Sequence, residues 1–276
     1  MTALLDDFII YLQAQDRSPH TVTAYRRDVV GFFAWVEQQV CQTVPPVAIT
    51  SFDVQKYRDA LVSLGRKPAT INRKLAALRV FFDWASREEH ASTNPATDIH
   101  GIRQQRHPPK ALSEQEVYRL QREAAAQRQL AKAQYADTAA PTVVYTYRDE
   151  ALLNLLLYTG LRVAEAAALK LEDVVLHDRS GKVIVRSGKG RKYREIPLHK
   201  EARKTLKAYL EVRLARTTGK GDSGGRSLFL GQRGPLGSRG IQLRLAALAE
   251  AAGVEGVTPH VLRHTFATRL LREVKT

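Results

Sequence analysis

The stretch VIVRSGKGRKYREIPL (residues 183–198) decides whether this chain is all helical or mixed. Val183–Val185 and Arg194–Leu198 are short runs with strand-forming residues, and Gly188–Lys192 lies between them. Such runs around a glycine-containing turn predict a β-hairpin, here with a basic tip. The hairpin places a small antiparallel sheet in a chain whose other segments mostly show helical periodicity.

The first part of the chain predicts a compact bundle of four helices. Apolar residues recur at helical spacing over 4–12, and again after Ser18-Pro19, which is a good pair for the N-cap and the first helical position. Two further helices are predicted over 51–64 and about 68–86.

The second part predicts a mixed, mainly helical domain around the hairpin. We expect helices over 113–134, 149–158, about 200–216, 239–252 and from Pro259 onward. We interpret Tyr135–Tyr147 as a loop without a function. In the last helix, we expect an inward face made of Val261, Leu262, Phe266 and Leu270.

The predicted fold class is therefore multidomain. Residues 1–103 form a helical domain, 104–111 form a basic linker containing two prolines, and 112–276 form a mixed α+β domain with a small antiparallel sheet. The one cysteine, Cys41, excludes an intramolecular disulfide, and we expect it to be a small buried side chain.

The charge points to a polyanionic partner. The net charge is +15 and the pI is about 10.1, with +3 on residues 1–112 and +12 on residues 113–276. Lys and Arg gain affinity by displacing the counterions of nucleic acid, although a generically basic protein or one bound to an anionic membrane has similar totals. No apolar run is long enough to span a bilayer, so we expect a cytoplasmic protein without a membrane partner.

Three groups of basic residues in the second part could carry chemistry. Arg162 and Glu165 stand three apart after a glycine turn, where an ordinary intrahelical ion pair is the alternative interpretation. Lys189 lies between two glycines at the hairpin tip, near Arg191, Lys192 and Arg194, where a solvated turn is equally compatible.

The third group is His260, Arg263 and His264, which share one face of the last helix. A zinc site is the competing idea, but the His-Glu-x-x-His pattern is absent, and half-buried histidines are a further alternative. Together the three groups fit phosphoryl transfer, because Arg forks bind nonbridging oxygens while Lys or His protonates a leaving oxygen. We predict no metal and no cofactor.

Three ordered motifs resemble the tyrosine recombinase or phage integrase family, including its Xer-type members. They are Thr-Gly-Leu-Arg-Val-Ala-Glu (159–165), Gly-Lys-Gly-Arg-Lys-Tyr-Arg-Glu-Ile-Pro-Leu (188–198) and Thr-Pro-His-Val-Leu-Arg-His-Thr-Phe-Ala-Thr (258–268). Residues 18–28 and 69–75 are similar to the family's helical core-binding domain, which has a SAM-like fold.

The resemblance implies residue roles and partners. Arg162 and Arg263 would hold the scissile phosphate, Lys189 would be the general acid, His260 the first active-site histidine, and Glu165 a support. We also assign His264 a supporting position. The implied partners are double-stranded DNA with a specific recombination site and other recombinase protomers, four in the complete assembly.

The family's Gly-His motif and nucleophilic tyrosine are not found after residue 263. The last of the ten tyrosines is Tyr209. We therefore expect this chain to bind DNA without forming a phosphotyrosyl link, as a truncated recombinase. A noncatalytic accessory or competitor, and a related metal-free topoisomerase, are the alternatives.

Several further basic residues are candidates for DNA contacts in the helical domain. They lie on the expected polar helix faces, where a solvated surface is an equally good interpretation of each: Arg26, Arg27, Arg73, Lys74 and Arg79. Chromosome dimer resolution, phage integration and movement of a mobile element all remain open as biological roles.

Overall fold

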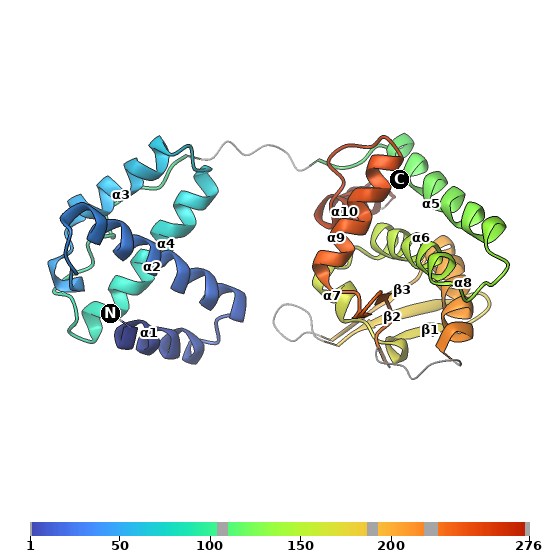
Figure 1. Cartoon of the computed structure of the whole chain (residues 1–276), viewed down its shortest axis with the longest axis horizontal. Coiled ribbons are helices and arrows are strands. Elements are labelled where there is room, and N and C mark those ends of the chain that lie inside the picture. Colours follow the sequence, from blue (N-terminus) through green and yellow to red (C-terminus); the bar gives the residue numbers. More distant parts are fainter. Residues whose placement is uncertain (1, 104–109, 187–192, 218–225, 274–276) are drawn as a thin grey trace. The chain divides into compact units, whose positions relative to one another are not determined.

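The computed structural model describes residues 2–103, 110–186, 193–217 and 226–273. The chain divides into two compact units, Met1–His107 and Pro108–Thr276, each with its own hydrophobic core (Figure 1). The boundary between the units falls inside the 104–111 segment that we predict to be a linker. The fold class, a helical unit followed by a mainly helical unit with a small antiparallel sheet, is confirmed.

The described part of the N-terminal unit contains four α-helices. They are α1 (Thr2–Ala14), α2 (Pro19–Val40), α3 (Ser51–Ser63) and α4 (Pro68–Arg87), with the short 3-10 helix η1 (Pro46–Ala48) before α3. Ser18 caps α2 by accepting a hydrogen bond from the backbone N–H of Thr21, and Thr50 and Asp53 form a capping box at the start of α3. Phenylalanines from α1, α2 and α4 pack in the core, largely edge to face.

The prediction for Cys41 is wrong. Cys41 is exposed and ends α2 in a left-handed conformation with φ of 55°. Its place at a helix end explains the exposure, because the chain leaves the packed helix there and the core is filled by larger side chains.

The C-terminal unit combines helices, which pack mainly around α6 (Pro141–Thr159), with a three-stranded antiparallel sheet. Its other helices are α5 (Glu114–Gln134), α7 (Val163–Ala168), η2 (Leu171–Asp173), α8 (Lys200–Thr217), α9 (Ser238–Ala251) and α10 (Pro259–Glu273). Its strands are β1 (Val174–Leu176), β2 (Gly181–Val185), β3 (Arg194–Pro197), β4 (Leu230–Gly231) and β5 (Gly234–Pro235).

The predicted hairpin is confirmed at its strands. β2 and β3 are antiparallel neighbours, with Val183 opposite Ile196 and Val185 opposite Arg194. The strand β1 pairs with the other edge of β2 and was not predicted, because three residues are too few to show alternation. The hairpin tip, residues 187–192, lies outside the described residues.

The interpretation of residues 135–147 as a loop is wrong from Pro141 onward. α6 begins there, with Pro141 at its first position, and Val143, Val144 and Tyr147 are already buried. α6 lies against α5, α8 and α10, so most of its residues are buried. A helix buried all round shows no amphipathic stripe, which is why periodicity found only part of it.

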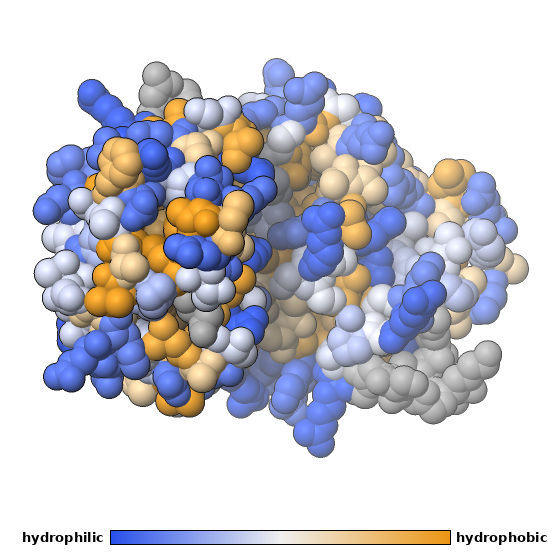
Figure 2. All heavy atoms as spheres, turned by 60° about the vertical axis from the view of Figure 1, so that its left-hand side comes forward, coloured by the Kyte–Doolittle hydropathy of each residue, from blue (hydrophilic) through white to orange (hydrophobic). Residues whose placement is uncertain are grey.

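The visible surface carries hydrophilic side chains with hydrophobic ones scattered among them (Figure 2). Exposed apolar residues occur on several helices, as in most folded proteins, for example Ile10, Phe52 and Leu130. In the part of the chain that the structure describes, no helix is long and apolar enough to cross a membrane.

Candidate active site

Glu165 is the centre of the candidate site. Its side chain is only 4% exposed, yet its carboxylate lies between two arginines. Arg162 precedes α7, and its backbone N–H donates to Oε2 of Glu165 at 2.8 Å while its Nη1 donates to Oε1 at 3.0 Å. Arg194, on β3, donates from Nη2 to Oε2 at 2.7 Å and from Nη1 to Oε1 at 3.2 Å. The carboxylate therefore joins the start of α7 to the hairpin.

Glu165 stays ionised because of these arginines. Burial by itself raises the pKa of this carboxyl, but hydrogen bonds from Arg194 and from the backbone and side chain of Arg162 outweigh it and lower the pKa to about 2. One buried negative charge thus faces two guanidinium groups, and the cluster keeps a net positive charge. Arg162 is 46% exposed, so this residue remains accessible to a ligand.

Arg263 reaches the same turn from the other end of the chain. It lies on α10, and its Nη1 donates to the backbone oxygen of Gly160, two residues before Arg162. Gly160 ends α6 with φ of 59°, and a Cβ built on it would lie 2.3 Å from Cδ1 of Phe266. Only glycine fits this turn, because Phe266 of α10 occupies the space that a side chain needs.

The structure brings together three of the predicted residues, and three others lie outside the described residues. Arg162, Glu165 and Arg263 meet at the turn between α6 and α7. His260 is exposed on the first turn of α10, and His264 is half-buried one turn later. Three predicted basic positions of the hairpin tip lie outside the described residues: Lys189, Arg191 and Lys192.

From the sequence we named Arg194 only as a basic neighbour of Lys189 and gave it no role in the site. Glu165 stands 29 positions earlier, so no local spacing links the two residues. The alternation of β3 could have indicated that Arg194 faces inward. Arg194 and Ile196 are half-buried on one face of the strand, while Glu195 points away and is exposed.

The predicted DNA-contact residues of the N-terminal unit fall into two groups. Arg26 and Arg27 are exposed on α2. The other three lie on α4 and are partly buried in contacts within the unit. Arg73 pairs with the buried Asp28, which also lies 3.5 Å from Nζ of Lys74.

Arg79 anchors the segment that follows α4. It donates to the backbone oxygen of Ala96 at 3.1 Å and to that of Ile99 at 2.5 Å. Asn94 donates back to the backbone oxygen of Arg79 at 3.0 Å. These contacts give Arg79 a structural task that its sequence position did not reveal.

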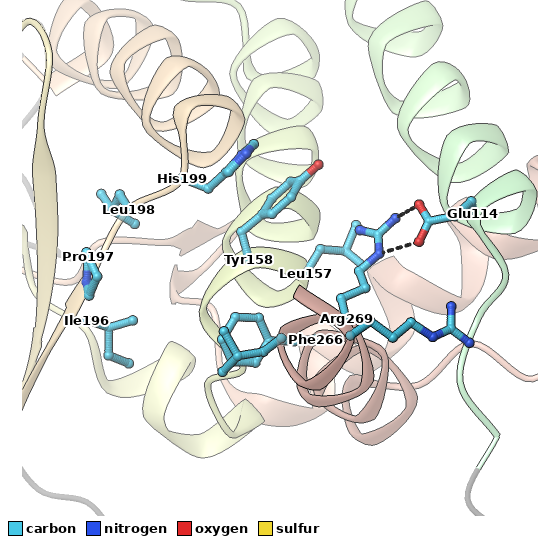
Figure 3. A pocket seen from close by; sticks show the side chains of 11 residues that line it. Glu114, Leu157, Tyr158, Ile196, Pro197, Leu198, His199, Phe266 and Arg269 are labelled. Atoms are coloured by element: carbon cyan, nitrogen blue, oxygen red, sulfur yellow. Dashed lines mark hydrogen bonds and ion pairs between the residues drawn. The ribbon is translucent and has the colours of Figure 1, made fainter. Parts of the chain in front are cut away.

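A groove of about 870 Å³ lies beside α10 (Figure 3). Tyr158 and His199 stack along its wall, with ring centroids 4.2 Å apart, and Phe266 and Arg269 of α10 also line it. Arg269 binds Glu114 with two hydrogen bonds, which lower the pKa of this carboxyl.

The expected inward position of Leu270 is wrong. Leu270 is 47% exposed because it faces this open groove rather than the packed core. Leu262, two turns earlier, is fully buried as expected.

Metal ligands do not gather in the described ranges. Nowhere in residues 2–103, 110–186, 193–217 and 226–273 do three or more His, Cys, Asp or Glu side chains come together as a metal would require. His260 and His264 therefore have no acidic companion among the described residues with which to form such a group.

Comparison with known proteins covers both units. A family model described as "Phage integrase family" matches residues 126–275, and one described as "Phage integrase, N-terminal SAM-like domain" matches residues 5–89. Tyrosine recombinase XerC of Pseudomonas syringae pv. syringae is 31% identical over 272 residues, covering 97% of this chain and 82% of that protein. Tyrosine recombinase XerC of Bacillus subtilis is 32% identical over 275 residues, covering 96% and 82%.

Solved structures share the fold at lower identity. XerH site-specific recombinase bound to palindromic difH substrate matches with a TM-score of 0.72 and 18% identity, covering 95% of this chain and 72% of that one. A lambda integrase tetramer bound to a Holliday junction matches with a TM-score of 0.71 and 19% identity, covering 99% and 70%. Because the sequence matches span both units, this chain belongs to the phage integrase family, among the tyrosine recombinases of the Xer type.

Proposed function

We propose that this protein acts in site-specific DNA recombination by tyrosine-recombinase strand cleavage and rejoining. In this proposal residues 1–276 bind duplex DNA and activate one phosphodiester. The observation that carries the proposal is the meeting of Arg162 and Arg263 at the Gly160 turn, with Glu165 holding Arg162. The XerC relatives and the DNA-bound XerH and lambda integrase structures support it.

The proposed chemistry is a displacement at phosphorus. A nucleophilic oxygen attacks the phosphorus, the P–O5′ bond breaks, and the 5′ oxygen takes up a proton. Arg162 and Arg263 would bind the nonbridging oxygens and stabilise the additional negative charge of the transition state. The family resemblance assigns proton delivery to Lys189 and a second polar contact to His260.

The nucleophile is the finer part of the proposal. In the family it is a tyrosine that follows the His260 to Arg263 motif, and the last tyrosine of these 276 residues is Tyr209. Tyr209 is fully buried, and its hydroxyl donates to the backbone oxygen of Leu228 at 3.1 Å. We propose that cleavage needs a tyrosine from outside these residues.

A second candidate function rests on the same observation. A recombinase relative that binds recombination sites without cutting them, as an accessory or competitor, needs the DNA-binding surfaces but no tyrosine after Arg263. The two candidates differ in one property, which is whether the bound phosphate is activated.

Chemical rescue on this chain separates the candidates. The binding site is first selected from random-sequence duplexes, and the selected DNA is then incubated with the chain and hydrogen peroxide as a small nucleophile. We expect peroxide-dependent breakage at one phosphate, lost in Arg162→Met and kept in Arg186→Met, which removes an equal charge near the hairpin. Tight, specific binding without breakage would instead establish the noncatalytic binder, and a chain that selects no site contradicts both.

A further inference from the structure

The Glu165 carboxylate accepts two hydrogen bonds from Arg162 and two from Arg194, but the two residues hold it differently. The backbone of Arg162 holds Oε2 alone, whereas the fork of Arg194 holds both oxygens. A terminal carboxylate torsion is broad, so a single backbone contact fixes one oxygen and leaves the plane of the group free to turn. The two parallel bonds from Arg194 define that plane.

The plane of the carboxylate decides where Arg162 lies. Oε1 accepts from Nη1 of Arg162, and this is the contact that orients the Arg162 guanidinium. If the carboxylate turns, Oε1 moves away from the position that Arg162 needs. Arg194 therefore acts on Arg162 through Glu165, without touching Arg162 in any hydrogen bond found between described residues.

Arg194 is itself held on a regular element. It stands opposite Val185 in the β2–β3 ladder, and its side chain is 34% exposed against 46% for Arg162. A fork based on a strand is more firmly placed than one based on a loop.

We propose that Arg194 is a positioning residue: it fixes the Glu165 carboxylate, which then orients Arg162 toward the phosphate. This inference rests on the proposed function for the role of Arg162. Arg194 affects the reaction through two other side chains, Glu165 and Arg162. Its loss therefore leaves Arg162, Glu165 and Arg263 in the site, but the Arg162 guanidinium is free to turn.

The matched control is Arg186, which directly follows β2, the strand that pairs with β3. Arg186 also binds a buried carboxylate, with Nε 2.6 Å from Oδ1 of Asp173, whose side chain is 6% exposed. Arg186→Met thus removes the same charge and a similar ion pair, one made with Asp173 rather than with Glu165. Arg194→Lys keeps the charge but replaces the planar fork by a single ammonium group.

The first measurement needs no DNA. The mobility of the Arg162 Nε–H group is measured by 15N relaxation, with its signal assigned from its loss in Arg162→Met. We expect its order parameter to fall in Arg194→Met, to fall less in Arg194→Lys, and to stay unchanged in Arg186→Met. Thermal unfolding of each variant shows that it is folded. An unchanged Arg162 order parameter in folded Arg194→Met overturns the inference.

The second measurement links the position to phosphate recognition. Single neutral methylphosphonates are scanned across the selected DNA site, and the Kd ratio of modified to unmodified duplex is determined. In the wild type we expect about a tenfold ratio at one phosphate, as for one charge-assisted contact. This ratio should fall distinctly in Arg162→Met, in which Arg263 still contacts the phosphate, fall by a smaller factor in Arg194→Met, and stay near the wild-type value in Arg186→Met.

The two measurements distinguish a wrong proposed function from a wrong role of Arg194. If no phosphate shows a dependence on Arg162, the proposed function is wrong, while the mobility of Arg162 still decides whether Arg194 positions it. If Arg162 recognises a phosphate but the ratio is unchanged in Arg194→Met, the proposed function stands and the role of Arg194 is rejected.

Discussion

Glu165 is an ionised side chain held almost out of water, and its charge is tolerable only because two arginines and a backbone N–H surround it. An unpaired charge in such a place costs several kcal/mol. The same residue therefore contributes to the stability of the C-terminal unit and to the orientation of Arg162, and a change at Glu165 affects both.

The stability contributed by Glu165 should depend on pH. Its folded pKa of about 2 lies below the ordinary value of 4.5, so the contribution is complete above pH 4.5 and is lost as the pH falls toward 2. We expect Glu165→Gln to lower the free energy of unfolding at pH 7 by on the order of 3 kcal/mol, and the difference from wild type to shrink at pH 3. Urea unfolding at both pH values measures it.

The control is Glu195, a glutamate on β3 next to Arg194. Glu195 is exposed and pairs with Lys182 and Tyr193, so water screens its charge. We expect Glu195→Gln to show a much smaller pH-dependent difference. An equal difference in both variants would contradict the special position of Glu165.

Gly160 should tolerate no side chain. Gly160→Ala combines a φ of 59° with a clash against Phe266 of α10. Gly253 has nearly the same φ, 61°, but nothing within 4 Å of a Cβ, so Gly253→Ala isolates the backbone cost, which is about 1–2 kcal/mol. We expect Gly160→Ala to lower Tm distinctly more than Gly253→Ala does, because α10 must shift. Equal Tm changes would show that Phe266 moves aside freely.

At the scale of elements, the helices of the N-terminal unit use their basic residues in two ways. Arg26 and Arg27 of α2 are exposed to solvent. Arg79 of α4 instead donates hydrogen bonds to backbone oxygens of the segment after that helix. An arginine on an amphipathic helix is therefore no guide by itself to a DNA contact. Whether such an arginine is available to DNA depends on its hydrogen-bond partners within the unit.

Two single substitutions test this division. Arg79→Met removes two hydrogen bonds from a charged donor to buried carbonyl groups, and we expect it to reduce the free energy of unfolding by about 1.5–3 kcal/mol. Arg26→Met should leave stability unchanged within about 0.5 kcal/mol and weaken DNA binding. Unfolding curves and Kd values of both variants check it, and the reverse pattern would show that α4 contacts DNA through Arg79.

At the scale of the whole molecule, charge dominates the expected interaction with DNA. The net charge of +15 is mostly carried by residues 113–276, where the candidate site also lies. Exposed Lys and Arg side chains neutralise phosphates and release counterions, which makes affinity depend on salt.

We therefore expect binding to the selected duplex to weaken steeply with salt. For several phosphate contacts, the Kd should rise about a thousandfold or more between about 50 and 200 mM monovalent salt. Fluorescence anisotropy across that range measures the slope. A flat Kd would show that phosphates contribute little, and an equal slope for a duplex lacking the selected site would show the nonspecific part.

The sequence predicted the order of the helices, the hairpin strands and the candidate residues Arg162, Glu165 and Arg263. It did so because capping residues, glycine turns and apolar periodicity are local signals that a linear pattern carries. It failed for the first half of α6, whose burial on all sides hides the periodicity, and for Leu270, which faces the groove beside α10 rather than the core.

The contacts that hold the candidate residues depend on tertiary packing. The bond from Arg263 to the Gly160 carbonyl spans 103 positions, and the fork from Arg194 to Glu165 spans 29. Such contacts depend on the packing of α10 on α6 and on the register of β3, and no spacing in the sequence encodes either. A hydrogen bond forms where two groups meet within about 3 Å, and folding, rather than sequence order, brings these groups together.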